Sequence, residues 1–408
     1  MNVILRNSTR RMIDESRASV EAEAFIAWLR TEGYTDYVID CHIRRLLFVL
    51  PKLSSGTEPP TLREADLVAV FGRERRPLTR FTNFASTRRV YSRYLRAQGR
   101  LITEPPTASE DLIGRYDRYL IDVRGLSASA RCHHKITLRS LLTGFPTSPS
   151  LRKLSRDDVE RSILERSRRI SRHSLQHEVG QLRAFLRYAH DTGLVRERLE
   201  SLDTPRTYRD ELPPRALPWK SVLKLLRSID RASRNGWRDL TILHLIAYYG
   251  LRPSEVVTLR LESIDWERGV LQVYQSKTRS LLILPLDSRT LRVLRDYLQH
   301  GRVASADDSP MLFLRARCPF IPLERTCVGD IFRKRMREAG LPDCRKHVSR
   351  LRHTLAMRLL GRGVGMKAIG DVLGHHSFYG TSAYLRLDVA MLRGDALQVP
   401  KAVGGRHV

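Results

Sequence analysis

The sequence is poor in cysteine and has no long apolar run. Its five cysteines are widely spaced, odd in number and free of any C-x-x-C pair, which indicates neither a disulfide framework nor a zinc knuckle. The first residues lack the apolar core of a signal peptide, and no stretch approaches the roughly 20 apolar residues that a membrane span needs. We therefore expect reduced thiols, no membrane partner and a cytoplasmic protein.

Acidic residues are also scarce. The 408 residues include 44 Asp and Glu against 72 Lys and Arg, a formal net charge of +28. Self-repulsion at that level weakens a compact state, so the charge predicts a polyanionic partner, with nucleic acid favoured over a membrane surface. The basic residues are mostly Arg, whose planar guanidinium suits bidentate phosphate contacts. The alternative is a basic protein whose charges are merely solvated.

Two proline-bearing stretches, 102–111 and 203–219, divide the chain. They predict three parts, residues 15–104, 108–205 and 215–400. The first two parts read as helical throughout, and the third mixes helices with one β-hairpin. The fold class expected is therefore mainly α, with a small β-sheet in the last part.

The first two parts look like copies of one helical unit. Asp66 and Asp158 are 92 positions apart, and Gly99 and Gly193 are 94 apart, each pair at a matching point of the pattern. Each unit has helices with one apolar stripe and a face rich in Arg and His, which favours contact with a DNA backbone over an ordinary solvated surface. The residues predicted to contact DNA are Arg44, Arg88, Arg172, His173, Arg183 and, in the hairpin of the third part, Arg279.

Five residues of the third part have the chemistry of a phosphodiester transesterase. Such an enzyme needs a nucleophile, positive charge around the phosphorus and an acid for the leaving oxygen. Arg252 lies two residues after Gly250, which can end a helix, and Arg352 lies beside the apolar stripe of a helix. Lys277 is at the hairpin tip, and His375 and Tyr384 flank a predicted turn. Taken singly, each has an ordinary reading as a surface cation, a turn residue or a packed aromatic.

The strings that carry these residues resemble those of the tyrosine recombinases, also called phage integrases. They are "GLRPSEVVTL", a hairpin lysine followed by "LPL", "LRHTLAMRLL" and "VLGHHSFYGTSAYLRL", in that order. The likeness covers roughly residues 215–390, and residues 108–205 resemble the core-binding (SAM-like) domain of the family more loosely. The resemblance implies a C-shaped DNA clamp whose last domain is catalytic.

The resemblance also implies a role for each residue. Arg252 and Arg352 would hold the scissile phosphate, and His375 would bond to one of its nonbridging oxygens. Tyr384 would form a 3′-phosphotyrosyl bond while Lys277 protonates the leaving 5′-oxygen. Because that bond conserves the energy of the phosphodiester, strand exchange would need no ATP, no metal and no cofactor.

One position departs from the family pattern. A histidine usually stands three residues before the second arginine, and here that position is Ser349. His347, two residues earlier, is the candidate substitute. Glu255, in "PSEV", matches a family acid that we interpret as structural support for the site.

The expected partner is double-stranded DNA, bound by a dimer on one site and a tetramer in synapsis, or by a hetero-oligomer with sister recombinases. The expected function is integration or excision of a mobile element, in the bacterial cytoplasm and nucleoid. Three alternatives stay open: a non-catalytic DNA-binding partner weakened at Ser349, a type IB topoisomerase or telomere resolvase, and a basic RNA-binding protein. The core-binding unit favours a recombinase over the second alternative, and no RNA-binding signature supports the third.

Overall fold

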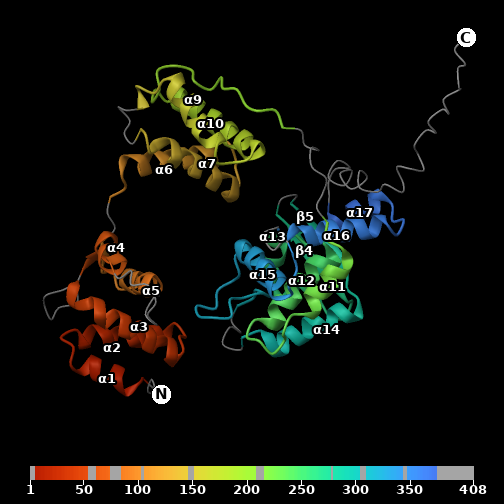
Figure 1. Cartoon of the computed structure of the whole chain (residues 1–408), viewed down its shortest axis with the longest axis horizontal. Coiled ribbons are helices and arrows are strands. Elements are labelled where there is room, and N and C mark those ends of the chain that lie inside the picture. The colour runs from red at the N-terminus through yellow and green to blue at the C-terminus, as the bar shows by residue number, and fades with distance from the viewer. Residues whose placement is uncertain are drawn as a thin grey trace, which may run out of the picture. The chain divides into compact units, whose positions relative to one another are not determined.

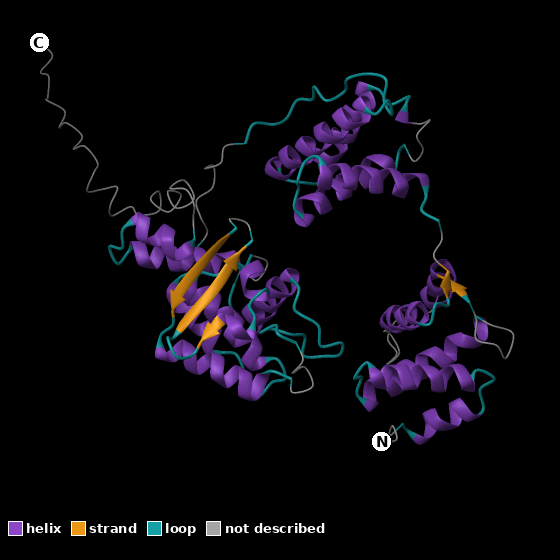
Figure 2. Ribbon diagram, turned by 180° about the vertical axis from the view of Figure 1, so that it is seen from behind, coloured by secondary structure: helices purple, strands orange, loops and turns teal. Residues whose placement is uncertain are grey.

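The fold is mainly helical with a small sheet in the last part, as predicted, and it also has a short strand pair in the first half that was not predicted (Figures 1 and 2). In the described part of the chain, no helix is long and apolar enough to cross a membrane. The computed structural model describes residues 5–53, 61–73, 84–102, 105–145, 151–207, 216–276, 279–303, 309–342 and 347–374. These residues belong to two compact units, Met1–Pro59 with Leu78–Thr87 and Leu212–Val408, and Pro60–Pro77 with Arg88–Glu211. The three-part division stays a prediction.

The first half of the chain is built from helices and one short parallel strand pair. The helices are α1 (Asn7–Asp14), α2 (Ser19–Thr31), α3 (Asp36–Val49), η1 (Leu50–Lys52), α4 (Glu64–Arg73), α5 (Phe84–Ala97), α6 (Ala108–Asp122), α7 (Ala128–Leu142), α9 (Arg156–Ser167) and α10 (Arg172–Asp191). The strands β1 (Leu62–Arg63) and β2 (Leu101–Ile102) pair with each other. Helix α1 lies before the predicted start of the first part at residue 15, and its Ile13 is buried.

Helices α6, α7, α9 and α10 enclose one apolar core. The predicted stripe on α10 is confirmed, because Val179, Leu182, Phe185 and Leu186 are all buried there. Side chains that bond to backbone N–H groups fix the starts of α6 and α9, at Thr107 with Glu110 and at Ser155 with Asp158.

The positions matched between the two N-terminal parts have the same local roles. Asp66 accepts a hydrogen bond from the N–H of Arg63 at 2.9 Å, and Asp158 accepts one from the N–H of Ser155 at 3.1 Å. Gly99 and Gly193 follow long helices in the left-handed conformation, with φ of 67° and 71°. These parallels support the predicted duplication, which stays a prediction.

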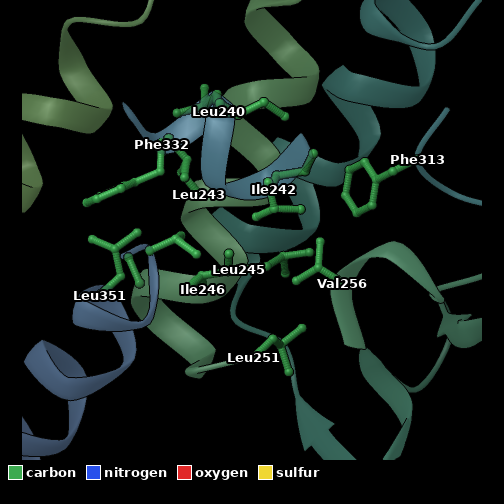
Figure 3. Packing of buried hydrophobic residues seen from close by; sticks show 14 of the residues in the cluster. Leu240, Ile242, Leu243, Leu245, Ile246, Leu251, Val256, Phe313, Phe332 and Leu351 are labelled. Carbon is green, nitrogen blue, oxygen red and sulfur yellow. The ribbon is translucent and has the colours of Figure 1, made fainter. Parts of the chain in front are cut away.

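The last part of the chain surrounds one buried helix. Its helices are α11 (Trp219–Arg227), α12 (Gly236–Tyr249), α13 (Pro253–Val257), η2 (Leu261–Ser263), α14 (Ser288–Asp296), η3 (Tyr297–Gly301), α15 (Arg325–Glu338), α16 (Ser349–Leu360) and α17 (Met366–Leu373). Residues 238–247 of α12 are all buried, because α11, α14, α15 and α16 contact this helix (Figures 1 and 3). Leu243, Leu245 and Ile246 pack against residues from several of these elements, including Phe332 and Leu351. A helix that is buried all round is typical of the centre of a domain, and its polar residues there, such as Asp239 and His244, have hydrogen-bond partners.

The predicted hairpin is confirmed. The strands β3 (Ile264–Asp265), β4 (Val270–Gln275) and β5 (Ser280–Pro285) form an antiparallel sheet in that order (Figure 2). The predicted helix ends are confirmed as well: Gly250 and Gly374 end α12 and α17 with positive φ, and Pro253 is the first residue of α13. The candidate site is built on these helix ends.

Acid should destabilise this domain through His244, which is buried in α12 with its Nε2 2.8 Å from the hydroxyl of Thr290. Burial, together with the nearby Arg289, lowers the pKa of His244 to about 4. In the unfolded chain the pKa of this histidine is near 6.5, so the unfolded state binds the proton more tightly than the folded state. The resulting stability is full above pH 6.5 and declines towards pH 4, by about 3 kcal/mol at most.

We expect His244→Gln to flatten the dependence of the free energy of unfolding on pH between 6.5 and 4, measured by urea titration. The exposed His300 offers a control, because His300→Gln should keep the wild-type slope. An unchanged slope in His244→Gln would contradict the prediction.

Candidate functional site

The first arginine of the candidate site lies at the corner between α12 and α13. Gly250 turns the chain with φ 65°, and Arg252 is the residue before the first turn of α13. Glu255, 3% exposed, accepts the backbone N–H of Arg252 at 2.7 Å and its Nη1 at 2.6 Å. The carboxylate thus fixes both the backbone and the guanidinium of Arg252, as the structural role predicted for Glu255 requires.

The end of strand β4 joins the same cluster. Gln275 is 1% exposed, and its Nε2 donates to Oε1 of Glu255 at 3.1 Å. Lys277 lies two residues further along the chain, outside the described residues. The contact between Gln275 and Glu255 therefore joins the hairpin to the Arg252 corner, two residues before the predicted general acid in the sequence.

The second arginine lies on α16 and is nearly buried. Arg352 is 7% exposed, which confirms its predicted place beside the apolar stripe. Its Nη1 donates to the carbonyl of Gly250, and its Nη2 donates to the carbonyl of Leu373 at 2.5 Å. Arg352 therefore joins Gly250, the residue that follows α12, to the last turn of α17.

Both arginines meet the chain at the end of α17. Arg252 donates through Nη2 to the carbonyl of Gly374 at 3.4 Å, one residue beyond the carbonyl that Arg352 contacts. His375 and Tyr384 follow this point in the sequence but lie outside the described residues. The structure brings Arg252, Arg352 and the start of the predicted nucleophile segment together.

The position of the missing family histidine lies on the same helix. Ser349 is the first residue of α16, half-buried, three residues before Arg352 and so on the same helix face. His347 precedes the helix and is exposed, with its carbonyl accepting the N–H of Arg350. Burial lowers the pKa of His353, which favours the neutral ring there. On placement alone, Ser349 fits the site better than His347.

The predicted DNA-contacting residues are spread over three elements and the hairpin turn. Arg172 and His173 are exposed in the first turn of α10, and Arg279 is exposed with φ 53°. Arg183 is half-buried and donates to the carbonyl of Leu202. Arg44 and Arg88 are half-buried. Exposure therefore favours Arg172, His173 and Arg279 as contacts, and the whole set stays a prediction.

Sequence reasoning missed Gln275. The inward positions of β4 alternate as Leu271, Val273 and Gln275, so the glutamine is a polar residue on the apolar face of the strand. A polar residue at a buried strand position needs a hydrogen-bond partner, and here that partner is Glu255. The break in the period-2 pattern was the available signal.

The geometry favours an anion over a cation as the ligand. Two guanidiniums face one segment, and Glu255 is the acid bonded to Arg252. Among the described residues no group of three or more His, Cys, Asp or Glu is arranged to hold a metal ion. Paired guanidiniums are suited to bidentate contact with phosphate oxygens.

Gly374→Ala should destabilise the site. Gly374 has φ 60°, and an added Cβ would lie 2.2 Å from Nε2 of Gln275. Backbone strain at positive φ costs about 1 kcal/mol, and displacing the buried Gln275 adds to it. We expect the free energy of unfolding to fall by about 2 kcal/mol, measured in urea.

Gly363 provides the matched control. Its φ is 76°, but nothing lies within 4 Å of an added Cβ, so Gly363→Ala should lower the free energy of unfolding only through backbone strain. Equal losses in the two variants would show that the contact with Gln275 contributes nothing.

Residues 216–391 match the Phage integrase family. Over 316 residues the chain is 32% identical to the integrase/recombinase y4rA of Sinorhizobium fredii, covering 75% of this chain and 76% of that protein. It is 28% identical over 283 residues to a tyrosine recombinase of Pseudothermotoga lettingae, covering 68% of this chain and 94% of that protein.

Solved structures show the same fold. The Tn1549 transposon integrase in complex with transposon right end DNA matches with a TM-score of 0.54 at 16% identity, over 71% of this chain and all of that chain. A lambda integrase dimer bound to a core site matches with a TM-score of 0.51 at 18% identity, over 67% of this chain and 93% of that chain.

Proposed function

This chain belongs to the phage integrase family of tyrosine recombinases, and on that premise we propose that it cuts and rejoins DNA through a 3′-phosphotyrosyl intermediate. The observation that carries the proposal is the convergence of Arg252 and Arg352 on the carbonyls of residues 373 and 374, immediately before His375. A phosphate placed between these guanidiniums lies next to Gly374, the last described residue before His375 and Tyr384 in the sequence.

The proposed reaction has two balanced steps. The Tyr384 hydroxyl gives its proton to the acceptor at Ser349 or His347 and its oxygen attacks the phosphorus, the bond to the 5′-oxygen breaks, and Lys277 gives that oxygen a proton. Arg252, Arg352 and His375 stabilise the charge that develops on the nonbridging oxygens. A 5′-hydroxyl from the partner strand then gives its proton to Lys277 and attacks the phosphotyrosine, and the bond to Tyr384 breaks as its oxygen takes the proton back from the acceptor. Both steps exchange one phosphoester for another, so ATP and metal are not required.

A substitution at Ser349, three residues before Arg352, tests which group takes the proton of Tyr384. If Ser349 occupies the acceptor position, Ser349→His places a stronger base there, and the cleavage rate should stay the same or rise, by up to about 10²-fold. The measurement is single-turnover cleavage of a nicked DNA site. The matched variant His347→Ala should change the rate little, and a large loss there would instead assign the role to His347.

We further propose double-stranded DNA as the substrate, held by the predicted core-binding unit and the last domain as a clamp. Exchange of two strands needs two catalytic copies and joining of two duplexes needs four, which favours a dimer on one site and a tetramer in synapsis. The Tn1549 transposon integrase among its structural neighbours and the integrase-named relatives support action on a mobile element.

A covalent trap tests the proposal. The protein is incubated, without metal, with nicked fragments from the flanks of its own gene, and a denaturing gel is read for protein attached to DNA. A covalent adduct supports transesterification and maps the site to a fragment. Salt-sensitive binding to the same fragments without any adduct would favour the non-catalytic partner instead.

A further inference from the structure

A second cationic centre lies at the opposite end of α12 from Arg252. Asp239, 1% exposed, accepts Nε and Nη2 of Arg238 on one oxygen at 3.2 and 2.9 Å. Its other oxygen accepts Nε and Nη2 of Arg335 at 3.0 and 2.8 Å. One buried carboxylate thus fixes two guanidinium planes, one from α12 and one from α15.

This cluster holds more positive than negative charge in a buried place. The side chains of Arg238 and Arg335 are 9% and 5% exposed, while Glu338, the second acid on Arg335, is 45% exposed and solvated. Arg238 also donates to the carbonyl of Leu314 at 3.2 Å. Buried charge without full compensation is costly, so the cluster favours an anion beside it.

An open hollow of about 480 Å³ adjoins the cluster. Besides Arg238 and Arg335, its border includes four more accessible cations, Arg234, Arg315, Arg317 and Lys334. Glu324 pairs with Arg315 at 2.8 Å, but this acid is 66% exposed. The six cations of the border therefore outnumber the acids that contact them, Asp239, Glu324 and Glu338.

The amide of Asn235 points to a ligand independently of the charge. Asn235 borders the same hollow, and its Oδ1 is buried with no hydrogen-bond partner in the described part of the chain. A half-turn of the amide would present its NH₂ group instead, so Asn235 can accept from a protonated ligand oxygen or donate to an ionised one. A buried polar atom of this kind normally has a partner.

We propose that this hollow binds the phosphoryl groups of a phosphate-bearing ligand. Several guanidiniums at fixed orientation match the spread of oxygens on adjoining phosphates better than they match a ligand with a single carboxylate. The volume suits a pyrophosphate or the phosphate chain of a nucleotide. Helix α12 separates Arg238 from the Arg252 corner by about 15–20 Å, so the bound phosphate is not the scissile one.

The test is calorimetric binding of pyrophosphate to the full chain in metal-free buffer. The pocket variant carries Arg234→Gln and Arg317→Gln, which leave the buried pairs around Asp239 intact. The control variant carries Arg260→Gln and Arg268→Gln, which remove the same charge from exposed positions of the same domain. We expect at least tenfold weaker binding in the pocket variant and less than twofold in the control. Equal loss in both variants, or no binding by wild type, would overturn the proposal.

The source of the phosphate is read from the same variants on duplex DNA. If the ligand is a DNA backbone, the affinity of the pocket variant for duplex DNA should depend less steeply on salt concentration than that of the control. The difference in slope should correspond to the loss of about one to two phosphate contacts. If it is a small phosphate ligand, duplex binding should match the control while pyrophosphate binding is lost. The covalent-adduct assay measures cleavage through Tyr384 separately. The proposed recombinase activity and the proposed phosphate site can therefore fail independently.

Discussion

Tyr384→Phe is expected to abolish the covalent protein–DNA adduct and all strand exchange. Phenylalanine keeps the aromatic ring but lacks the oxygen that the proposed reaction bonds to phosphorus, so cleavage should fall by about 10⁴-fold or more. DNA affinity should change less than about threefold, since phosphate contacts by Lys and Arg supply most of it. Single-turnover cleavage and a binding titration at fixed salt measure the two quantities.

Tyr274 is the matched control for the tyrosine. It is 60% exposed on the outer face of β4, and Tyr274→Phe removes a hydroxyl with the same chemistry from the same domain. That variant should cleave at the wild-type rate. A Tyr384→Phe protein that still forms an adduct would remove Tyr384 from the mechanism and require another nucleophile.

Arg352→Lys has the second largest expected effect. Lysine keeps the positive charge but cannot donate simultaneously to the carbonyls of Gly250 and Leu373 and to a phosphate in one plane. Loss of such a preorganised donor typically lowers the rate by 10²–10³-fold, and we expect about that loss in cleavage with little change in DNA affinity.

Because Arg352 is buried, the variant must also be tested for folding. Urea unfolding separates a fold defect from a catalytic one, and we expect a loss of about 1–3 kcal/mol from the unmade hydrogen bonds. The exposed Arg362, beyond the end of the same helix, gives the control Arg362→Lys, which should keep both stability and rate. A cleavage loss fully explained by unfolding would argue against a role in the reaction.

Much of this fold was predictable because its signals are local. The β-hairpin follows from alternating apolar residues, and the ends of α12 and α17 follow from Gly250 and Gly374, whose positive φ suits glycine. Helix α1 was missed because its eight residues bury little apolar surface, Ile13 being its main contribution.

The site was predictable in its residue types but not in its contacts. The motifs predict two arginines in one centre, but they do not reveal that Glu255 is shared between Arg252 and Gln275. Nor do they reveal that Arg352 bonds to main-chain carbonyls. These contacts join segments about 20 to 120 residues apart, and their geometry depends on packing that no local pattern encodes.

The segment entering the last domain is fastened to the helix that carries Arg352. The N–H of Leu217 donates to the hydroxyl of Thr354 at 2.8 Å, and Arg350 donates to the carbonyl of Ala216 at 3.2 Å. A displacement of residues 216 and 217 would therefore act on α16. If Arg352 holds the scissile phosphate as proposed, these contacts would couple the position of residues 216–217 to the guanidinium that α16 carries.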